Sequence, residues 1–178
     1  MTGRKLRFAV MGTGFWSTLQ IPAWFEAGEV ELVALYNRTV SKAEAIASKY
    51  GVSKVYDDPE KLLQNEQLDF VDIITEVPAH APLVLLSAKY KVPVICQKPM
   101  APDYETCVRM VEACKDAEVS FFIHENWRWQ PHFRFFKSIL EQNPVGRLRR
   151  VEFTQFNRGR KCFANHDVCR TCFWVCFL

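Results

Sequence analysis

Short apolar runs alternate with helix-like segments over residues 5–124, and this alternation constrains the fold more than any other feature. Strands are predicted for runs rich in Val, Ile, Leu and Phe at 5–11, 31–36, 55–56, 70–74, 92–96 and 120–124. Strands that are joined through helices run parallel, and the crossing connections cover both faces of the sheet. We therefore expect an α/β fold built on a doubly wound parallel sheet.

Capping signals predict where several of the intervening helices begin and end. Ser41 and Glu44 have the spacing of a capping box, and Gly51 follows as a C-terminal stop. Asp58, which precedes a proline, and Asp103 are each placed to act as an N-cap. The helices that these residues delimit fall between the predicted strands, as the alternation requires.

Composition and charge exclude several other classes of protein. With 49% apolar residues the chain can bury a core, so general disorder is not expected. No apolar run approaches the roughly 20 residues that span a bilayer, and we expect a cytoplasmic chain with no membrane partner. The net charge of +3 reflects the segment 147–178, where seven Lys and Arg face two acidic residues. Because the preceding body is not basic, we expect no nucleic-acid partner.

Two glycines follow the first predicted strand, in a motif of the form G-x-G-x-x-S. The first glycine permits a tight turn, and the second lets a pyrophosphate approach the backbone at a helix N-terminus. Such glycines also occur in purely structural turns, but the position at the start of a βαβ unit favours dinucleotide binding. The motif predicts an NAD(P)-binding Rossmann domain over residues 1–125, with cofactor contacts from Gly12, Thr13, Gly14, Phe15 and Trp16.

The residues after the second predicted strand indicate which dinucleotide is bound. NAD-binding folds usually place a carboxylate there, whereas this chain has Asn37 followed by Arg38. Asn37 does not repel a 2′-phosphate, Arg38 can bind it as a fork, and Lys42 adds a nearby point charge. We expect NADP(H) in preference to NAD(H). The alternative is that these are solvated charges of a surface loop.

Gln97 and Lys98 follow the predicted strand at 92–96, where open α/β sheets bind ligands. A lysine that is desolvated beside a cationic nicotinamide ring has a lowered pKa. It can then accept the hydroxyl proton of a substrate as hydride leaves the adjacent carbon. The alternative is a surface lysine before a turn proline. A tight turn here would favour a cis peptide bond between Lys98 and Pro99.

Five motifs, in order, resemble the Gfo/Idh/MocA oxidoreductases, which include glucose–fructose oxidoreductase and inositol dehydrogenases. They lie at 12–16, 37–39, 72–80, 97–101 and 128–131. The resemblance runs over residues 5–158. It implies a Rossmann domain, an α/β domain with a large antiparallel sheet, and NAD(P)-dependent hydride transfer on sugars, polyols or related cyclic alcohols.

The resemblance also implies roles for individual residues. Lys98 matches the family's catalytic lysine, while Thr75 and His80 match positions around the nicotinamide ribose. Asn126 and Arg128 match the segment at the boundary between cofactor and substrate. The expected partner is a small sugar- or polyol-type substrate, and full-length relatives of this kind are expected to form homo-oligomers.

Two features depart from the family pattern. Gln97 stands where glutamate is usual, which should lower the pKa of Lys98 because an attractive charge is lost. The family's downstream Asp-x-x-x-His pair has no match, so residues 126–161 are expected to form a connector helix and the first strand of an incomplete, truncated α/β substrate domain.

The tail at 162–178 contains four cysteines and His166, and it has no helical or strand periodicity. A zinc site could use such ligands, but the spacing favours an appended, frameshifted sequence, and no metal site is expected. Two other functions remain open beside the oxidoreductase. One is a non-catalytic dinucleotide-binding module or inactive fragment, and the other is a metal or nucleic-acid module formed by the basic stretch and this tail.

Overall fold

The computed structural model describes residues 3–144 and 146–147, which fall into two compact units, Met1–His124 and Glu125–Leu178. The strands of the first unit are β1 Leu6–Met11, β2 Val30–Tyr36, β3 Val55–Tyr56, β4 Phe70–Ile73, β5 Val94–Gln97 and β6 Phe121–His124. Its helices are α1 Ser17–Ala27, α2 Val40–Tyr50, α3 Pro59–Asn65, α4 Val77–Lys89 and α5 Tyr104–Asp116.

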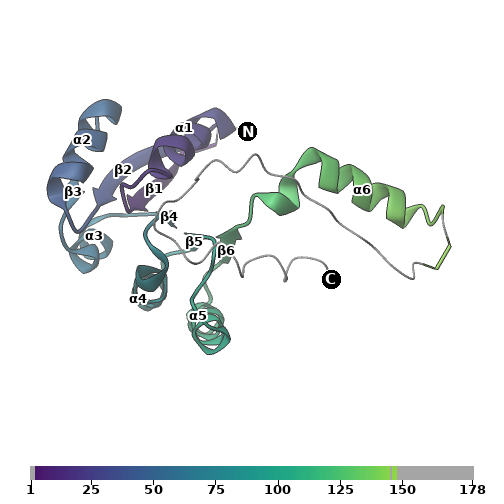
Figure 1. The fold of residues 1–178 in the computed structure, drawn as a ribbon. Coiled ribbons are helices and arrows are strands. Elements are labelled where there is room, and N and C mark those ends of the chain that lie inside the picture. The colour runs from purple at the N-terminus through teal and green to yellow at the C-terminus, as the bar shows by residue number, and fades with distance from the viewer. Residues whose placement is uncertain (1–2, 145, 148–178) are drawn as a thin grey trace, which may run out of the picture. The chain divides into compact units, whose positions relative to one another are not determined.

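The six strands form one parallel sheet in the order β3-β2-β1-β4-β5-β6 (Figure 1). The chain starts with β1 in the middle of the sheet and adds β2 and β3 on one side of it. It then returns to place β4 on the other side of β1, followed by β5 and β6. The switch point lies between β1 and β4, where ligands bind in open α/β sheets. The predicted doubly wound Rossmann topology is confirmed.

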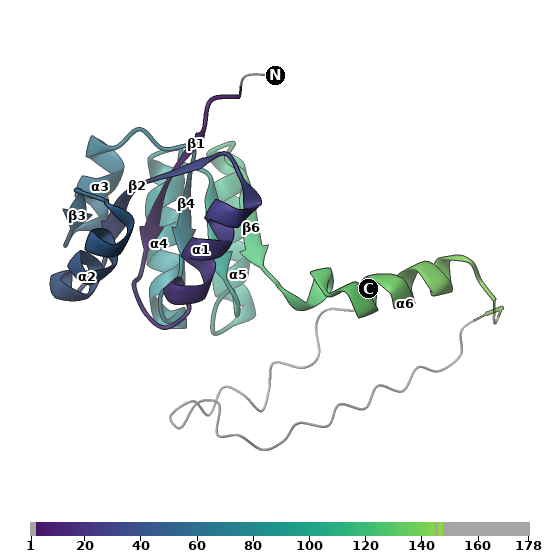
Figure 2. The ribbon, with the colours of Figure 1, turned by 90° about the horizontal axis from the view of Figure 1, so that it is seen from above.

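Two layers of helices cover the two faces of the sheet. Figures 1 and 2 show α1 and α2 over one face and α4 and α5 over the other. Side chains of β1 divide between them, because successive residues of a strand point to opposite faces. Phe8 and Val10 pack with Ile21 of α1, whereas Ala9 and Met11 pack with the cluster under α4 and α5.

Three of the predicted helix boundaries are confirmed. Asp58 accepts hydrogen bonds from the first-turn amides of α3, and Asp103 accepts one from the first turn of α5. Gly51 ends α2 in the left-handed conformation, with φ of 68°. These three caps satisfy backbone groups that a helix end otherwise leaves unpaired.

The capping box predicted at Ser41 and Glu44 is wrong. Helix α2 begins one residue earlier, at Val40, with Thr39 as an N-cap that makes no side-chain cap bond. The carbonyl of Thr39 already accepts the amide of Lys42, so the first turn closes before Ser41 could cap it.

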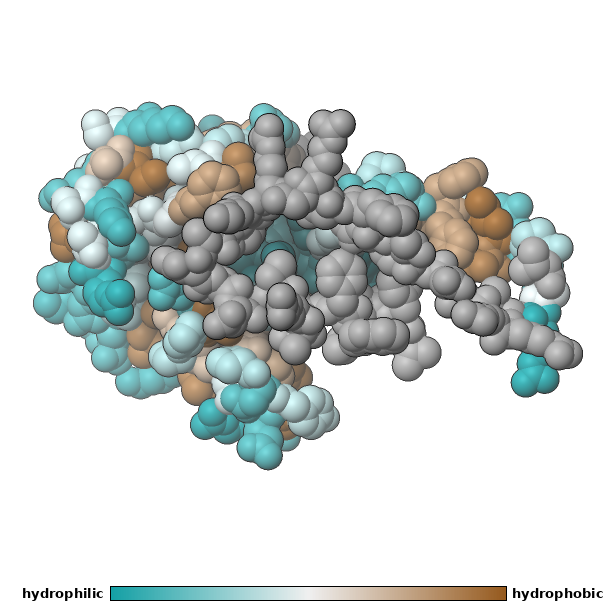
Figure 3. All heavy atoms as spheres, in the orientation of Figure 1, coloured by the Kyte–Doolittle hydropathy of each residue, from teal (hydrophilic) through white to brown (hydrophobic). Residues whose placement is uncertain are grey.

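The second unit contains a 3₁₀ turn, Trp127–Trp129, and helix α6, Pro131–Glu141. No residue of α6 is buried, and Phe135 is 67% exposed. Figure 3 shows apolar residues at the surface over this helix. The strand predicted after residue 147 and the tail at 162–178 lie outside the described residues, and the predicted domain boundaries stay predictions. None of the described helices is long and apolar enough to cross a membrane.

Gly12 occupies a tight turn directly after β1. Its φ is 106°, and a Cβ there would lie 2.6 Å from the carbonyl oxygen of Ile74 at the end of β4. The amide of Gly12 also donates to Tyr36 O at 2.8 Å. Only glycine meets both the conformational and the steric requirement.

We expect Gly12→Ala to lower the free energy of unfolding by at least about 2 kcal/mol, because it adds both a clash and a strained φ. Urea denaturation measures this loss. Gly14→Ala is the matched control, since a Cβ at Gly14 meets nothing within 4 Å. Equal stability of the two variants would contradict the steric argument.

Candidate functional site

The sequence-predicted cofactor residues of the first unit gather at the carboxyl edge of the sheet. Parallel strands end at the same edge, so the segments that follow β1, β2, β4 and β5 converge there. They contribute the glycine loop 12–16, Asn37 and Arg38, Thr75, and Gln97 with Lys98. Within the described part of the chain, no cluster of three His, Cys, Asp or Glu side chains could hold a metal ion.

The glycine loop presents unpaired backbone donors at the start of α1. Ser17 and Thr18 donate their amides back to Gly14 O and Phe15 O, each at 3.1 Å. Within the described residues, the preceding amides of Gly14, Phe15 and Trp16 donate no hydrogen bond. Because Gly14 also borders open space, an anion can approach these amides at the positive end of the helix dipole.

Two buried hydroxyls beside this loop also lack partners among the described residues. They are Thr13 Oγ1 and Thr75 Oγ1, and neither is exposed to solvent. A buried hydroxyl without a hydrogen bond costs about 1–3 kcal/mol. The two hydroxyls therefore fit a bound group that brings its own polar atoms to the ends of β1 and β4.

Asn37 braces the glycine loop. Its Oδ1 accepts the amide of Thr13 at 3.2 Å, and its Nδ2 donates to Thr39 O at 2.9 Å. Both ends of the side-chain amide are thus occupied by backbone. Arg38 and Lys42 are exposed, and neither forms an ion pair with a described residue, so both cations can reach a ligand.

Lys98 lies close to the glycine loop. Its Nζ is 5.7 Å from the centroid of the Trp16 ring, a cation–π distance. Its backbone amide donates to Gln97 Oε1 at 2.8 Å, and the Lys98–Pro99 peptide is cis as predicted. The ammonium is thereby held over the residue that opens α1.

His80 is completely buried and ties two loops of this edge together. Its Nδ1 lies 3.0 Å from Pro99 O and its Nε2 lies 3.1 Å from Thr75 O. Carbonyl oxygens only accept, so the ring nitrogen that carries the proton donates to the carbonyl that it faces. His80 thereby holds Thr75 and the segment after Lys98 together, and its assignment as a cofactor contact stays a prediction.

The sequence interpretation missed a buried polar cluster directly beneath Gln97 and Lys98. Asp72 of β4 is 0% exposed, and Gln20 Nε2 lies 2.8 Å from each of its carboxylate oxygens. Trp24 Nε1 donates to the same carboxylate at 2.7 Å. The Gln20 oxygen accepts from Gln97 Nε2 at 3.0 Å. The sequence signal for this cluster was Asp72, a carboxylate inside an otherwise apolar strand. Nothing in the sequence pattern of α1 identified Gln20 and Trp24 as its partners.

Burial raises the pKa of Asp72 to about 6, although the hydrogen bonds from Trp24 and Gln20 oppose the shift. His124 lies beside the cluster, with its Nδ1 next to Gln20 Nε2, and burial lowers the pKa of its ring. Its position makes it a neighbour of the buried carboxylate.

Asn126 and Arg128, the predicted substrate contacts, belong to the second unit. Both are exposed, and the Arg128 guanidinium lies 5.8 Å from the Trp129 ring centroid. Their assignment to a substrate stays a prediction.

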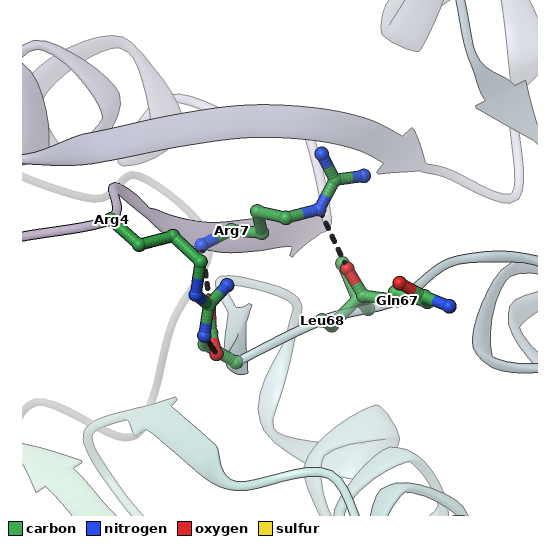
Figure 4. Close-up of a pocket in the computed structure, with 5 residues that line it drawn as sticks. Arg4, Arg7, Gln67 and Leu68 are labelled. Atoms are coloured by element: carbon green, nitrogen blue, oxygen red, sulfur yellow. Dashed lines mark hydrogen bonds and ion pairs between the residues drawn. The ribbon is translucent and has the colours of Figure 1, made fainter.

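The opposite edge of the sheet holds an open depression formed by Arg4, Arg7, Gln67, Leu68 and Asp69 (Figure 4). Arg4 pairs with Asp69 and holds the pKa of that carboxyl below its usual range. The amide of Arg7 donates to Asp69 at 2.7 Å. These bonds join the starts of β1 and β4, so we interpret the depression as part of the scaffold.

The raised pKa of Asp72 predicts a pH dependence of stability. The fold favours its protonated form, so this contribution is fully present below about pH 4 and is lost as pH rises through about 6. From about pH 7.5 to pH 5, the free energy of unfolding of the wild type should rise relative to Asp72→Asn by about 1 kcal/mol. Urea titrations of both chains measure it. Parallel pH curves would contradict the burial of an ionisable Asp72.

Comparison with known proteins gives consistent matches over the first unit. The sequence profile of the GFO_IDH_MocA oxidoreductase family, NAD-binding Rossmann fold, matches residues 6–125. D-apiose dehydrogenase of Rhizobium rhizogenes is 34% identical over 146 residues, which cover 82% of this chain and 42% of that enzyme. Myo-inositol 2-dehydrogenase of Thermotoga maritima is 28% identical over 84% of this chain and 45% of that enzyme.

Solved structures agree with these sequence matches. An oxidoreductase from Agrobacterium radiobacter, in complex with NAD⁺, L-tartaric acid and magnesium, has a TM-score of 0.77 and 34% identity. The match covers 80% of this chain and 42% of that one, so the chain spans less than half the length of these relatives. With its profile match, its parallel sheet and its glycine loop, the chain belongs to the Gfo/Idh/MocA oxidoreductase family and carries that family's NAD(P)-binding Rossmann domain.

Proposed function

We propose that this chain binds NADP(H) at the carboxyl edge of its sheet and belongs to an enzyme that oxidises a sugar, polyol or related cyclic alcohol. One observation carries the proposal. Among the described residues, the amides of Gly14, Phe15 and Trp16 have no hydrogen-bond partner, Gly14 borders open space, and Lys98 lies over the same loop. The amides fit a pyrophosphate, and the lysine fits a proton acceptor beside it.

The described residues fit the nicotinamide cofactor in a second respect. The hydroxyls of Thr13 and Thr75 would gain partners from its polar atoms. The cofactor, when bound, supplies the hydride acceptor. Lys98, whose Nζ lies over the Trp16 ring, would receive the substrate hydroxyl proton at that atom.

The preference for NADP(H) rests on charge at the end of β2. Arg38 and Lys42 are exposed cations without ion pairs to described residues, and Asn37 brings no negative charge. A 2′-phosphate would gain a forked contact from Arg38. Relatives named for D-apiose and myo-inositol support a sugar or polyol as the substrate class.

A second candidate is a dinucleotide-binding module without turnover. It is favoured by the distribution of the predicted residues, since the predicted cofactor contacts gather in the first unit and the predicted substrate contacts Asn126 and Arg128 belong to the second. Such a module would bind the cofactor as proposed but would leave Lys98 without a substrate.

Arg38→Ala should weaken NADPH binding about tenfold, equivalent to about 1.4 kcal/mol, and leave NADH binding nearly unchanged. The change removes the fork that contacts the 2′-phosphate, which NADH lacks. Fluorescence titration of the purified chain measures both constants, because Trp16 and Trp24 lie close enough to report on a reduced nicotinamide.

Arg109→Ala is the matched control, since Arg109 lies on α5 and bonds only to Thr106 among the described residues. Gly14→Ala should weaken both cofactors. An equal loss of NADPH and NADH in Arg38→Ala would contradict the assignment of the phosphate contact.

Lys98→Ala separates the two candidate functions. If the chain turns over, oxidation of D-apiose or myo-inositol should fall at least about 100-fold, while NADPH affinity stays within about threefold, because the lysine acts on the proton. Steady-state reduction of NADP⁺ measures turnover. Cofactor binding by the wild type without turnover on any alcohol tested would favour the non-catalytic module.

A further inference from the structure

A directional chain of hydrogen bonds connects the backbone of Lys98 to the buried carboxylate of Asp72. The amide of Lys98 donates to Gln97 Oε1 at 2.8 Å, and Gln97 Nε2 donates to Gln20 Oε1 at 3.0 Å. Gln20 Nε2 then donates to Asp72, 2.8 Å from each oxygen. Each link begins at a donor and ends at an acceptor, and strands β5 and β4 are joined through α1.

The direction of this chain is fixed at its buried end. An ionised carboxylate only accepts, so Gln20 must turn its NH₂ toward Asp72 and its oxygen toward Gln97. Gln97 must in turn present its NH₂ to Gln20, which leaves its oxygen for the amide of Lys98. Reversing any one amide would set two donors or two acceptors against each other.

Among the described residues, no cation compensates the buried carboxylate of Asp72. The groups that face its carboxylate are the Gln20 amide from α1 and the Trp24 indole from the same helix. Its titratable neighbours are His124 of β6, which meets Gln20, and the Cys96 thiol of β5, which interacts electrostatically with Asp72. No lysine or arginine of the described residues pairs with Asp72. A buried carboxylate without a counter-charge lowers stability. Asp72 therefore does not serve stability, and its position at the buried end of the hydrogen-bond chain suggests a role in orienting that chain.

We propose that Asp72 and Gln20 are positioning residues for Lys98, which they hold through Gln97 at the end of β5. This inference rests on the proposed role of Lys98 as proton acceptor. It also explains the glutamine at position 97, because only a side chain with both a donor and an acceptor completes the chain above an ionised Asp72.

A glutamate at position 97 would break the chain. Its carboxylate would still accept from the Lys98 amide, but its other oxygen would face Gln20 Oε1, and a second negative charge would enter a dry site. Asp72→Asn has the opposite defect, because its NH₂ would face the NH₂ of Gln20, which lies near both carboxylate oxygens. Gln20 would then reverse its amide, Gln97 would follow, and the NH₂ of Gln97 would face the Lys98 amide. The two changes together restore a complete chain. The residue-72 NH₂ donates to Gln20 Oε1, Gln20 Nε2 donates to the carboxylate at position 97, and that carboxylate still accepts from the Lys98 amide.

The test is a cycle of four chains: wild type, Gln97→Glu, Asp72→Asn, and the double variant. Near pH 7.5, each single change should lower Tm by about 4–8 °C, and the double variant should return to within about 2 °C of the wild type. In ¹H–¹⁵N spectra, the Lys98 amide should move upfield in Asp72→Asn, although residue 72 does not touch it, and should return in the double variant. Gln142→Glu, at an exposed position, is the charge control and should change neither.

The inference would be overturned if the two losses in Tm simply add in the double variant, or if the chemical shift of the Lys98 amide is the same in Asp72→Asn as in the wild type. NADPH titration of the wild type separates this failure from that of the proposed function. Absence of NADPH binding overturns the function, while the Tm cycle and the amide resonance still decide whether the chain positions Lys98. Binding that is intact while the cycle is additive overturns the positioning role alone.

Discussion

The close approach of Gly12 to the Ile74 carbonyl is the constraint on which the site depends. It brings the turn after β1 against the end of β4, at the point where the sheet reverses its winding. Because no side chain fits between them, the loop after Gly12 passes directly over the sheet edge and into α1. The unpaired amides of residues 14–16 and the buried hydroxyls of Thr13 and Thr75 are consequences of that path.

Helix α1 has two roles that its sequence pattern does not separate. Its first turn offers amides to an anion, and its second and third turns place Gln20 and Trp24 over Asp72. The same helix therefore connects the glycine loop to the end of β5 that is followed by Lys98. A cofactor that orders the first turn would also hold the polar cluster beneath the lysine.

The fold was predictable because its signals are local. The strand–helix alternation, the caps at Asp58 and Asp103, and the glycine at 51 each act within a few residues. The capping box at Ser41 failed because Thr39, already fixed by Asn37, closes the turn first. The cluster of Gln20 and Asp72 was missed because its partners lie 52 residues apart, and only the folded sheet brings them together.

The glutamine at position 97 shows how a departure from a family pattern can follow from a distant residue. Taken by itself, the substitution only removes a negative charge that would attract the Lys98 ammonium. Above a buried carboxylate that pairs with no cation of the described residues, a second carboxylate would be the more costly choice, because Gln20 can donate to only one of the two. The amide at position 97 and the acid at position 72 therefore depend on each other. Asp72 fixes the orientation of the Gln20 amide, Gln20 fixes that of Gln97, and Gln97 accepts from the backbone amide of Lys98.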